Sequence, residues 1–93
     1  MDMKKISRIQ TRSALSELSR GEFVVGAKQL RKAVRAGRVR LVFLAQNADP
    51  AVTEPLAELC RQHSIQITWV STMAELGRVC GIEVGAAAAA ALN

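Results

Sequence analysis

The sequence predicts an α/β sandwich in which helices pack on a mixed sheet of about four strands. Short apolar runs alternate along the chain with segments whose apolar residues recur every three or four positions. The chain has 93 residues, of which 49% are hydrophobic, and this is enough for one core but not for two. We therefore expect a single domain over residues 1–93.

Residues 1–21 predict an N-terminal helix that is frayed. Four apolar side chains fall loosely on one side of residues 5–19, namely Ile6, Ile9, Leu15 and Leu18. Gly21 stands just past the end of this helix. Residues 22–25 read Glu-Phe-Val-Val and are closed by Gly26, a pattern that is typical of a short edge strand.

A basic helix is predicted to follow this strand and to end at Gly37. At about 100° per residue its cations occupy one narrow arc; they are Lys28, Arg31, Lys32 and Arg35. The opposite side carries Leu30, Ala33 and Val34. The pattern indicates a helix with an apolar back and a cationic front.

Three further elements follow in the middle of the chain. Residues 39–45 form a nearly continuous apolar and β-branched run, typical of a strand buried on both faces of a parallel sheet. Asp49 is placed to cap, and Pro50 to begin, a helix that runs to His63 with Val52, Leu56 and Leu59 directed inward. Residues 65–70 alternate as a third strand.

The last quarter of the chain predicts one more helix and leaves the tail open. Residues 72–75, Thr-Met-Ala-Glu, form a capping-box pattern that begins a helix through Leu76 to Cys80, ended by Gly81. In the tail, the alanines of residues 86–91 favour a helix by intrinsic propensity. A strand of small residues between two helical layers is the alternative.

Charge is distributed unevenly along the chain. The first forty residues hold eleven of the thirteen basic side chains and three acids, whereas residues 41–93 hold two basic and five acidic residues. Such a field favours a polyanionic partner. Aromatic residues make up only 3% of the chain, which argues against base stacking as the main mode of binding.

Two segments are candidates for binding. Residues 26–29, Gly-Ala-Lys-Gln, open the basic helix, so its unpaired backbone N–H groups lie beside Lys28 as an anion site; the alternative is a solvated helix face. Gly81 and Gly85 bracket Ile82, Glu83 and Val84, which suggests apolar side chains exposed on a turn as a contact surface. The alternative is that Ile82 and Val84 pack inward.

No residue pattern supports catalysis, metal binding or a membrane segment. Cys60 and His63 have a ligand-like spacing, but a zinc site needs four ligands and only Cys80 supplies another thiol. The sequence has no phosphate-binding glycine motif, no nucleophile elbow and no apolar run of about 20 residues. We expect no cofactor, no metal and no membrane partner, and a reduced cytoplasmic protein because the cysteines form no disulfide framework.

Three linked segments together resemble a known family. They are residues 25–37 (VGAKQLRKAVRAG), 41–50 (LVFLAQNADP) and 76–87 (LGRVCGIEVGAA). They resemble the ribosomal L-seven-Ae / L-thirty-e family of kink-turn RNA-binding proteins, most closely its bacterial branch. The likeness extends over residues 23–92 and implies a three-layer α/β/α sandwich whose alanine tail is the final strand.

The resemblance also implies a binding mode and its residues. Gly26, Lys28, Gln29 and Lys32 fall on the family's helix motif, which enters the major groove of a kinked RNA at tandem sheared G·A pairs. Lys28 and Gln29 would contact guanine edges, and Lys32 the base or its phosphate, while Arg31 and Arg35 add backbone charge. Residues 82–84, Ile-Glu-Val, fall on the loop that covers the flipped-out nucleotide.

We therefore expect a non-catalytic, monomeric RNA-binding protein that recognises a kink-turn, in the ribosome or in another structured RNA. One alternative is a protein-interaction subunit whose basic face is only solvated. An enzyme of RNA modification is suggested by the fold class alone and lacks a catalytic constellation.

Overall fold

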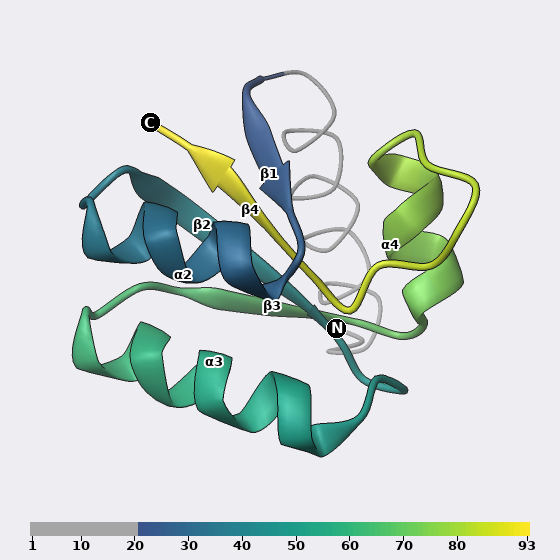
Figure 1. Ribbon diagram of the computed structural model, residues 1–93, viewed down its shortest axis with the longest axis horizontal. Helices are drawn as coiled ribbons and strands as arrows, with labels where there is room; N and C mark the ends of the chain where they lie inside the picture. Colours follow the sequence, from purple (N-terminus) through teal and green to yellow (C-terminus); the bar gives the residue numbers. More distant parts are fainter. Residues whose placement is uncertain (1–20) are drawn as a thin grey trace, which may run out of the picture.

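The computed structural model describes residues 21–93, so the helix predicted over residues 5–19 lies outside the described residues. Two helices cover one face of a sheet and a third covers the other face (Figure 1). The elements are β1 (Phe23–Val25), α2 (Ala27–Arg35), β2 (Val39–Ala45), α3 (Pro50–Gln62), β3 (Ile67–Val70), α4 (Met73–Val79) and β4 (Ala88–Leu92). This arrangement confirms the predicted α/β/α sandwich.

The sheet is mixed and has four strands in the order β1-β4-β2-β3. Strand β2 pairs in parallel with β3 and antiparallel with β4, and β4 pairs antiparallel with β1. Ala89 lies opposite Val25 on one side and Phe43 on the other. The carboxyl ends of β1 and β2 and the start of β4 therefore meet at one end of the sheet.

The alanine tail is a strand, so the helix that propensity favours there is wrong and the strand implied by the resemblance is confirmed. Residues 88–91 are at most 1% exposed and alternate between the two faces. Ala88 and Ala90 pack with α2 and α3, while Ala89 and Ala91 pack with α4. Hydrogen bonding to β1 and β2 on both sides, with close packing on both faces, outweighs a helix preference of less than about 1 kcal/mol per residue.

The helix ends follow the predicted caps closely. The Asp49 side chain accepts a hydrogen bond from the Ala51 N–H at 3.0 Å, and the Thr72 hydroxyl accepts one from the Glu75 N–H at 3.0 Å. The third strand begins at Ile67 rather than at residue 65, because the Ile65 N–H bonds back to the Cys60 carbonyl as part of the turn that ends α3. Among residues 21–93 no helix is long and apolar enough to cross a membrane.

Candidate functional site

The start of α2 is held by a glycine that no other residue type could replace without strain. Gly26 has a φ of 102°, in the region that side chains disfavour, although its missing Cβ would meet no atom within 4 Å. Its N–H donates to the Ala88 carbonyl at 2.9 Å, and its carbonyl accepts from the Leu30 N–H at 3.0 Å. Within residues 21–93 no side chain caps this end, and no acid lies in the first turn, so the positive end of the helix is open to an anion.

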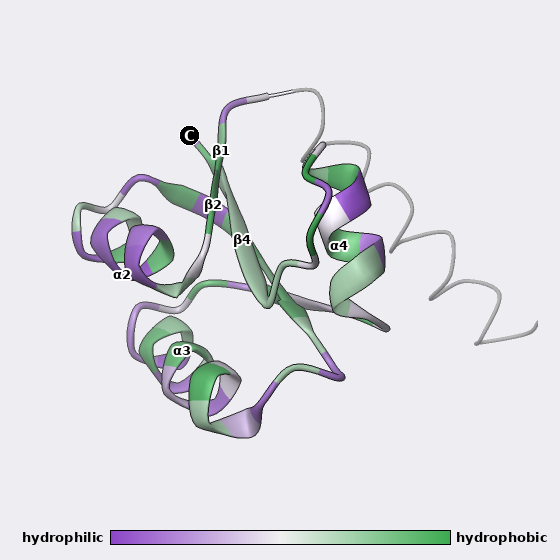
Figure 2. Ribbon diagram, turned by 45° about the vertical axis from the view of Figure 1, so that its right-hand side comes forward, coloured by the Kyte–Doolittle hydropathy of each residue, from purple (hydrophilic) through white to green (hydrophobic). Residues whose placement is uncertain are grey.

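The outer face of α2 is cationic and its inner face is apolar, as the spacing predicts. Lys28, Gln29, Lys32 and Arg35 are exposed, and Arg31 is half-buried. The inner face buries Leu30, Ala33 and Val34. The hydropathy colouring in Figure 2 shows this division between the outer and inner sides of the helix. None of the four cations is ion-paired with a carboxylate of residues 21–93, so their charge is available to a ligand.

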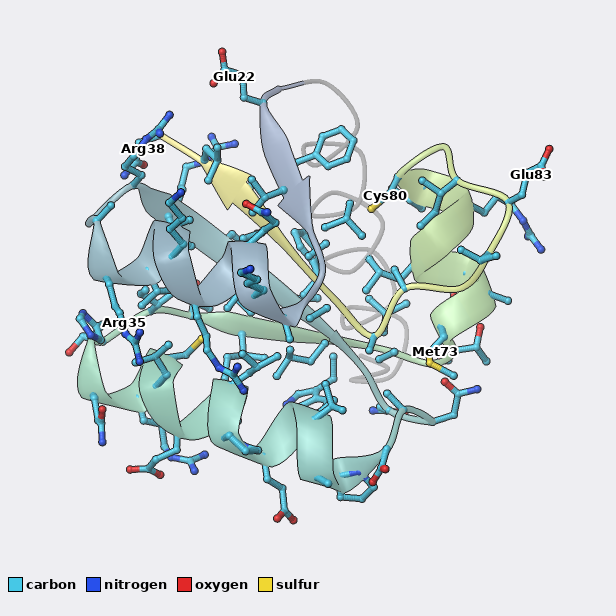
Figure 3. All side chains as sticks on the ribbon, in the orientation of Figure 1. Glu22, Arg35, Arg38, Met73, Cys80 and Glu83 are labelled. Atoms are coloured by element: carbon cyan, nitrogen blue, oxygen red, sulfur yellow. The ribbon has the colours of Figure 1, made fainter. Side chains whose placement is uncertain are left out.

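Arg38 belongs to the same basic surface, although the helical spacing did not include it. It lines a shallow hollow of about 220 Å³, with Val24, Gln29, Lys32, Ala33, Ala36 and Leu92. Gly37, with a φ of 70°, reverses the chain after α2 and brings Arg38 back toward β1 and β4. Figure 3 shows Arg35 and Arg38 at this end of the helix. In the sequence, Gly37 directly after the basic run was the sign that the chain turns back at this point.

The turn after α4 carries exposed apolar side chains. Ile82 is 36% exposed and Val84 is 72% exposed, and Glu83 projects outward (Figure 3). The structure thus confirms the exposed turn and excludes the alternative in which these residues pack inward. Two large aliphatic groups in water indicate a contact surface.

The same turn is pressed against α4 by two glycines. A Cβ added to Gly77 would collide with the Val84 carbonyl oxygen, and one added to Gly85 would lie 2.9 Å from the Met73 Cβ. The Ala86 N–H donates to the Met73 carbonyl at 2.9 Å, and the Ile82 N–H donates to the Gly77 carbonyl at 3.0 Å. Residues 81–87 are therefore a fixed platform for Ile82 and Val84.

The two candidate segments flank the start of β4. The Gly26 N–H is bonded to Ala88, and residues 82–87 lead directly into that residue. A third segment adds a brace at the same end of the sheet, because the Asn47 side-chain oxygen accepts the Met73 N–H at 2.8 Å. No local pattern predicts this contact, because it joins residues 26 positions apart.

The cysteines are buried in the core on opposite faces of the sheet. Cys60 packs in the α2–α3 side of the core and Cys80 in the α4 side, and both are free thiols. Burial raises the pKa of both thiols, and the nearby Arg61 charge lowers that of Cys60 by less. His63 is exposed, and no group of three or more His, Cys, Asp or Glu side chains within residues 21–93 is arranged to hold a metal.

Comparison with known proteins finds one family whose model matches most of the chain. The model of the Ribosomal protein L7Ae/L30e/S12e/Gadd45 family matches residues 10–93. RNA-binding protein TTE2299 of Caldanaerobacter subterraneus subsp. tengcongensis is 49% identical over 67 residues, which cover 72% of this chain and 82% of that protein. RNA-binding protein YbxF of Geobacillus stearothermophilus is 36% identical over 76 residues, covering 82% of this chain and 93% of that protein.

A solved structure shows the same fold. The Giardia lamblia 15.5kD RNA binding protein superposes with a TM-score of 0.78 over 100% of this chain and 77% of its own, at 21% sequence identity.

Proposed function

The chain belongs to the Ribosomal protein L7Ae/L30e/S12e/Gadd45 family, and on that premise we propose that it binds RNA at a kink-turn. Members of this kind bind RNA without catalysing a reaction, so the role is one of recognition and stabilisation. The partner is a kinked RNA with tandem G·A pairs, in the ribosome or in another structured transcript. We propose that the protein acts as a monomer, because a single chain carries the whole surface, and that it does so in the cytoplasm.

One observation carries this proposal. A helix start whose cap and cations have no side-chain partner within residues 21–93, and a turn with exposed aliphatic side chains, flank the same strand end at Ala88. The first suits phosphates and base edges, and the second suits the apolar face of an unstacked base. The names of the relatives, which describe RNA-binding proteins, support the same conclusion.

The binding mode follows from the shape of RNA. A regular A-form major groove is too narrow for side chains, and a kink opens it enough to admit the tip of a helix. Lys28 and Gln29 then reach guanine edges, since an ammonium donates and an amide both donates and accepts. Lys32, with Arg31 and Arg35 further along α2, neutralises phosphates of the adjoining strand.

The turn completes the site. The flipped-out nucleotide of the bulge lies on Ile82 and Val84, with Glu83 between them at the rim. Burying one such aliphatic side chain against a base contributes about 1.5 kcal/mol, which is about tenfold in Kd. Arg38, in the hollow beside Gln29 and Lys32, extends the phosphate contact.

Filter binding tests the proposal with two RNAs of equal length. One forms a kink-turn, and the other replaces the G·A pairs with Watson–Crick pairs so that the duplex stays straight. We expect the protein to prefer the kinked RNA by at least about tenfold at physiological salt, and Gln29→Ala to reduce that preference more than it reduces binding to the straight RNA. Equal affinity for both RNAs would refute kink-turn recognition and leave only charge attraction.

A further inference from the structure

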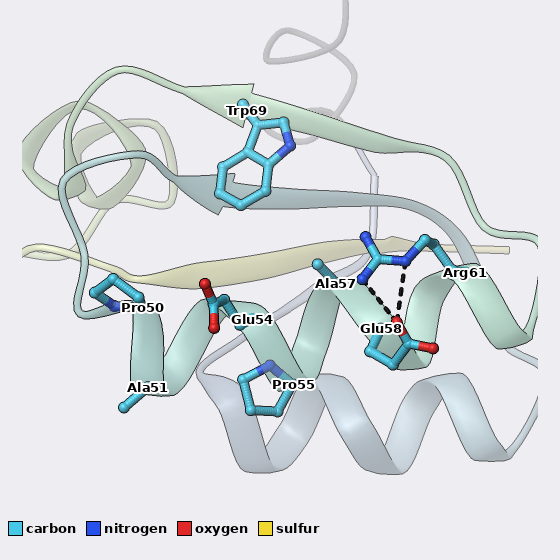
Figure 4. Close-up of a pocket in the computed structure, with 8 residues that line it drawn as sticks. All are labelled: Pro50, Ala51, Glu54, Pro55, Ala57, Glu58, Arg61 and Trp69. Atoms are coloured by element: carbon cyan, nitrogen blue, oxygen red, sulfur yellow. Dashed lines mark hydrogen bonds and ion pairs between the residues drawn. The ribbon is translucent and has the colours of Figure 1, made fainter.

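A second hollow lies on the side of the molecule that carries acidic residues. It has a volume of about 670 Å³ and lies between the edge strand β3 and the outer side of α3 (Figure 4). The residues that line it are Pro50, Ala51, Glu54, Pro55, Ala57, Glu58, Arg61 and Trp69. We call this hollow the β3–α3 groove. It shares no residue with α2 or with the turn at residues 81–87.

Trp69 forms one wall of the β3–α3 groove. It is the only tryptophan of the chain, and 42% of its surface is exposed although it stands in a strand. Its neighbour Val70 is 1% exposed, and Ile67, on the same face as Trp69, packs into the α2–α3 side of the core. A large part of the indole is therefore left for a partner, and an exposed indole is a frequent anchor for one.

The opposite wall of the groove is acidic. The Glu54 side chain is exposed and makes no hydrogen bond or ion pair within residues 21–93. Glu58 binds Arg61 through Oε2 alone, at 2.7 Å to Nη2 and 3.1 Å to Nε, so its second oxygen remains available. Pro50 and Pro55 add rigid apolar surface along α3, and Pro55 lies farther from the indole than Glu54 does (Figure 4). An aromatic face opposite carboxylates is the environment that a guanidinium or ammonium group prefers.

We propose that the β3–α3 groove binds a lysine- or arginine-bearing segment of a protein partner. The cation lies between the Trp69 ring and the Glu54 carboxylate, and the apolar part of the cationic side chain covers Pro50 and Pro55. Charge complementarity selects this occupant, because the carboxylates repel RNA phosphates and anionic lipid headgroups. The molecule would thus hold RNA at α2 and a basic protein segment at α3 at the same time.

Tryptophan fluorescence gives a direct test, because the chain has one tryptophan and no tyrosine. The probe is a short arginine–glycine peptide with blocked ends, titrated into the full-length protein at low salt. Its control is the same peptide with citrulline, which keeps the shape of arginine and lacks the charge. We expect a saturable change in Trp69 emission with the arginine peptide, weakened by added salt, and no change with the citrulline peptide.

Matched variants locate the binding. Glu54→Gln should lower the affinity for the arginine peptide about threefold to fivefold. Glu22→Gln removes the same charge next to the opposite edge strand and should leave that affinity unchanged. Trp69→Leu keeps apolar bulk and removes the aromatic face, so calorimetry should show a loss of at least about threefold. The proposal is overturned if the citrulline peptide binds equally well, or if Glu54→Gln and Glu22→Gln have the same effect.

A kink-turn RNA titration of the same variants keeps this proposal separate from the proposed function. Glu54→Gln and Trp69→Leu should bind the RNA as the unmodified protein does, because neither residue lies on α2 or on the turn at residues 81–87. Loss of RNA affinity in these two variants would contradict the independence of the groove. Failure of the unmodified protein to bind RNA would refute the proposed function alone.

Discussion

Replacing Gly77 with alanine should detach the turn at residues 81–87 from α4 without touching the basic helix. Gly77 is buried in α4, and an added Cβ would collide with the Val84 carbonyl oxygen. The same Cβ would lie 3.1 Å from the Gly85 Cα. Every obstacle is backbone, so the clash can be relieved only by moving the turn as a unit.

Two opposing effects set the change in the free energy of unfolding. Alanine is better than glycine inside a helix by about 1 kcal/mol. Overpacking against rigid atoms costs about 1–3 kcal/mol. We expect a net loss of about 1 kcal/mol, which corresponds to a fall in Tm of about 5 °C for a domain of this size. A displaced turn also loses the cover that Val84 gives a base, so RNA affinity should fall about tenfold.

Urea denaturation and filter binding to a kink-turn RNA measure the two effects. Ala74→Gly is the matched control, because Ala74 is an exposed residue of α4 whose replacement lowers the helix preference by up to about 1 kcal/mol. This control should lose stability and keep its RNA affinity. If the Gly77→Ala protein is about 1 kcal/mol more stable than the unmodified chain and binds RNA equally well, the added Cβ does not displace the turn.

Three further predictions concern charge, capping and burial. Lys32→Ala should reduce the slope of log Kd against log salt by about 1, as removal of one phosphate contact requires, while Arg61→Ala on α3 should leave the slope unchanged; equal slopes for both variants would count against the α2 surface. Thr72→Ala removes the cap on the Glu75 N–H and should cost about 1 kcal/mol in urea denaturation, and an unchanged midpoint would contradict the cap. Burial raises the pKa of Cys60 above its ordinary 9.0, so the folded protein keeps a proton that the unfolded chain loses. The contribution of Cys60 to stability is therefore complete below pH 9.0 and declines as the pH rises above it. Urea denaturation across this range should show a falling free energy of unfolding. A rising free energy of unfolding would contradict a raised pKa for this thiol.

The elements that the sequence predicts most closely are those with local causes. Residues 39–45 match β2 at both ends, because a continuous branched run bounded by Gly37 and by polar residues has few other solutions. The caps at Asp49 and Thr72 depend on side chains within three residues of the bond that they make. Local chemistry of this kind is visible without a structure.

The features that the sequence did not predict depend on residues that are distant along the chain. Intrinsic propensity within residues 86–91 favours a helix, and the strand is imposed by β1 and β2 on either side of β4. In the same way, the brace from Asn47 to Met73 and the contact of Gly77 with Val84 exist only once the chain is folded. The helical spacing predicted the exposed cations of α2, but not that Arg38 lines the hollow beside them.

Amide chemical-shift mapping of the full-length protein with a kink-turn RNA locates the surface that the RNA covers. If the RNA binds at α2 and at the turn, then within residues 21–93 the largest shifts fall in two separate segments, residues 26–32 and residues 81–87, with little change in the amides of α3 and β3. Shifts confined to the basic helix would show that the turn takes no part. Shifts concentrated on α3 and β3 would contradict binding at α2 and the turn and place the RNA on the opposite edge of the sheet.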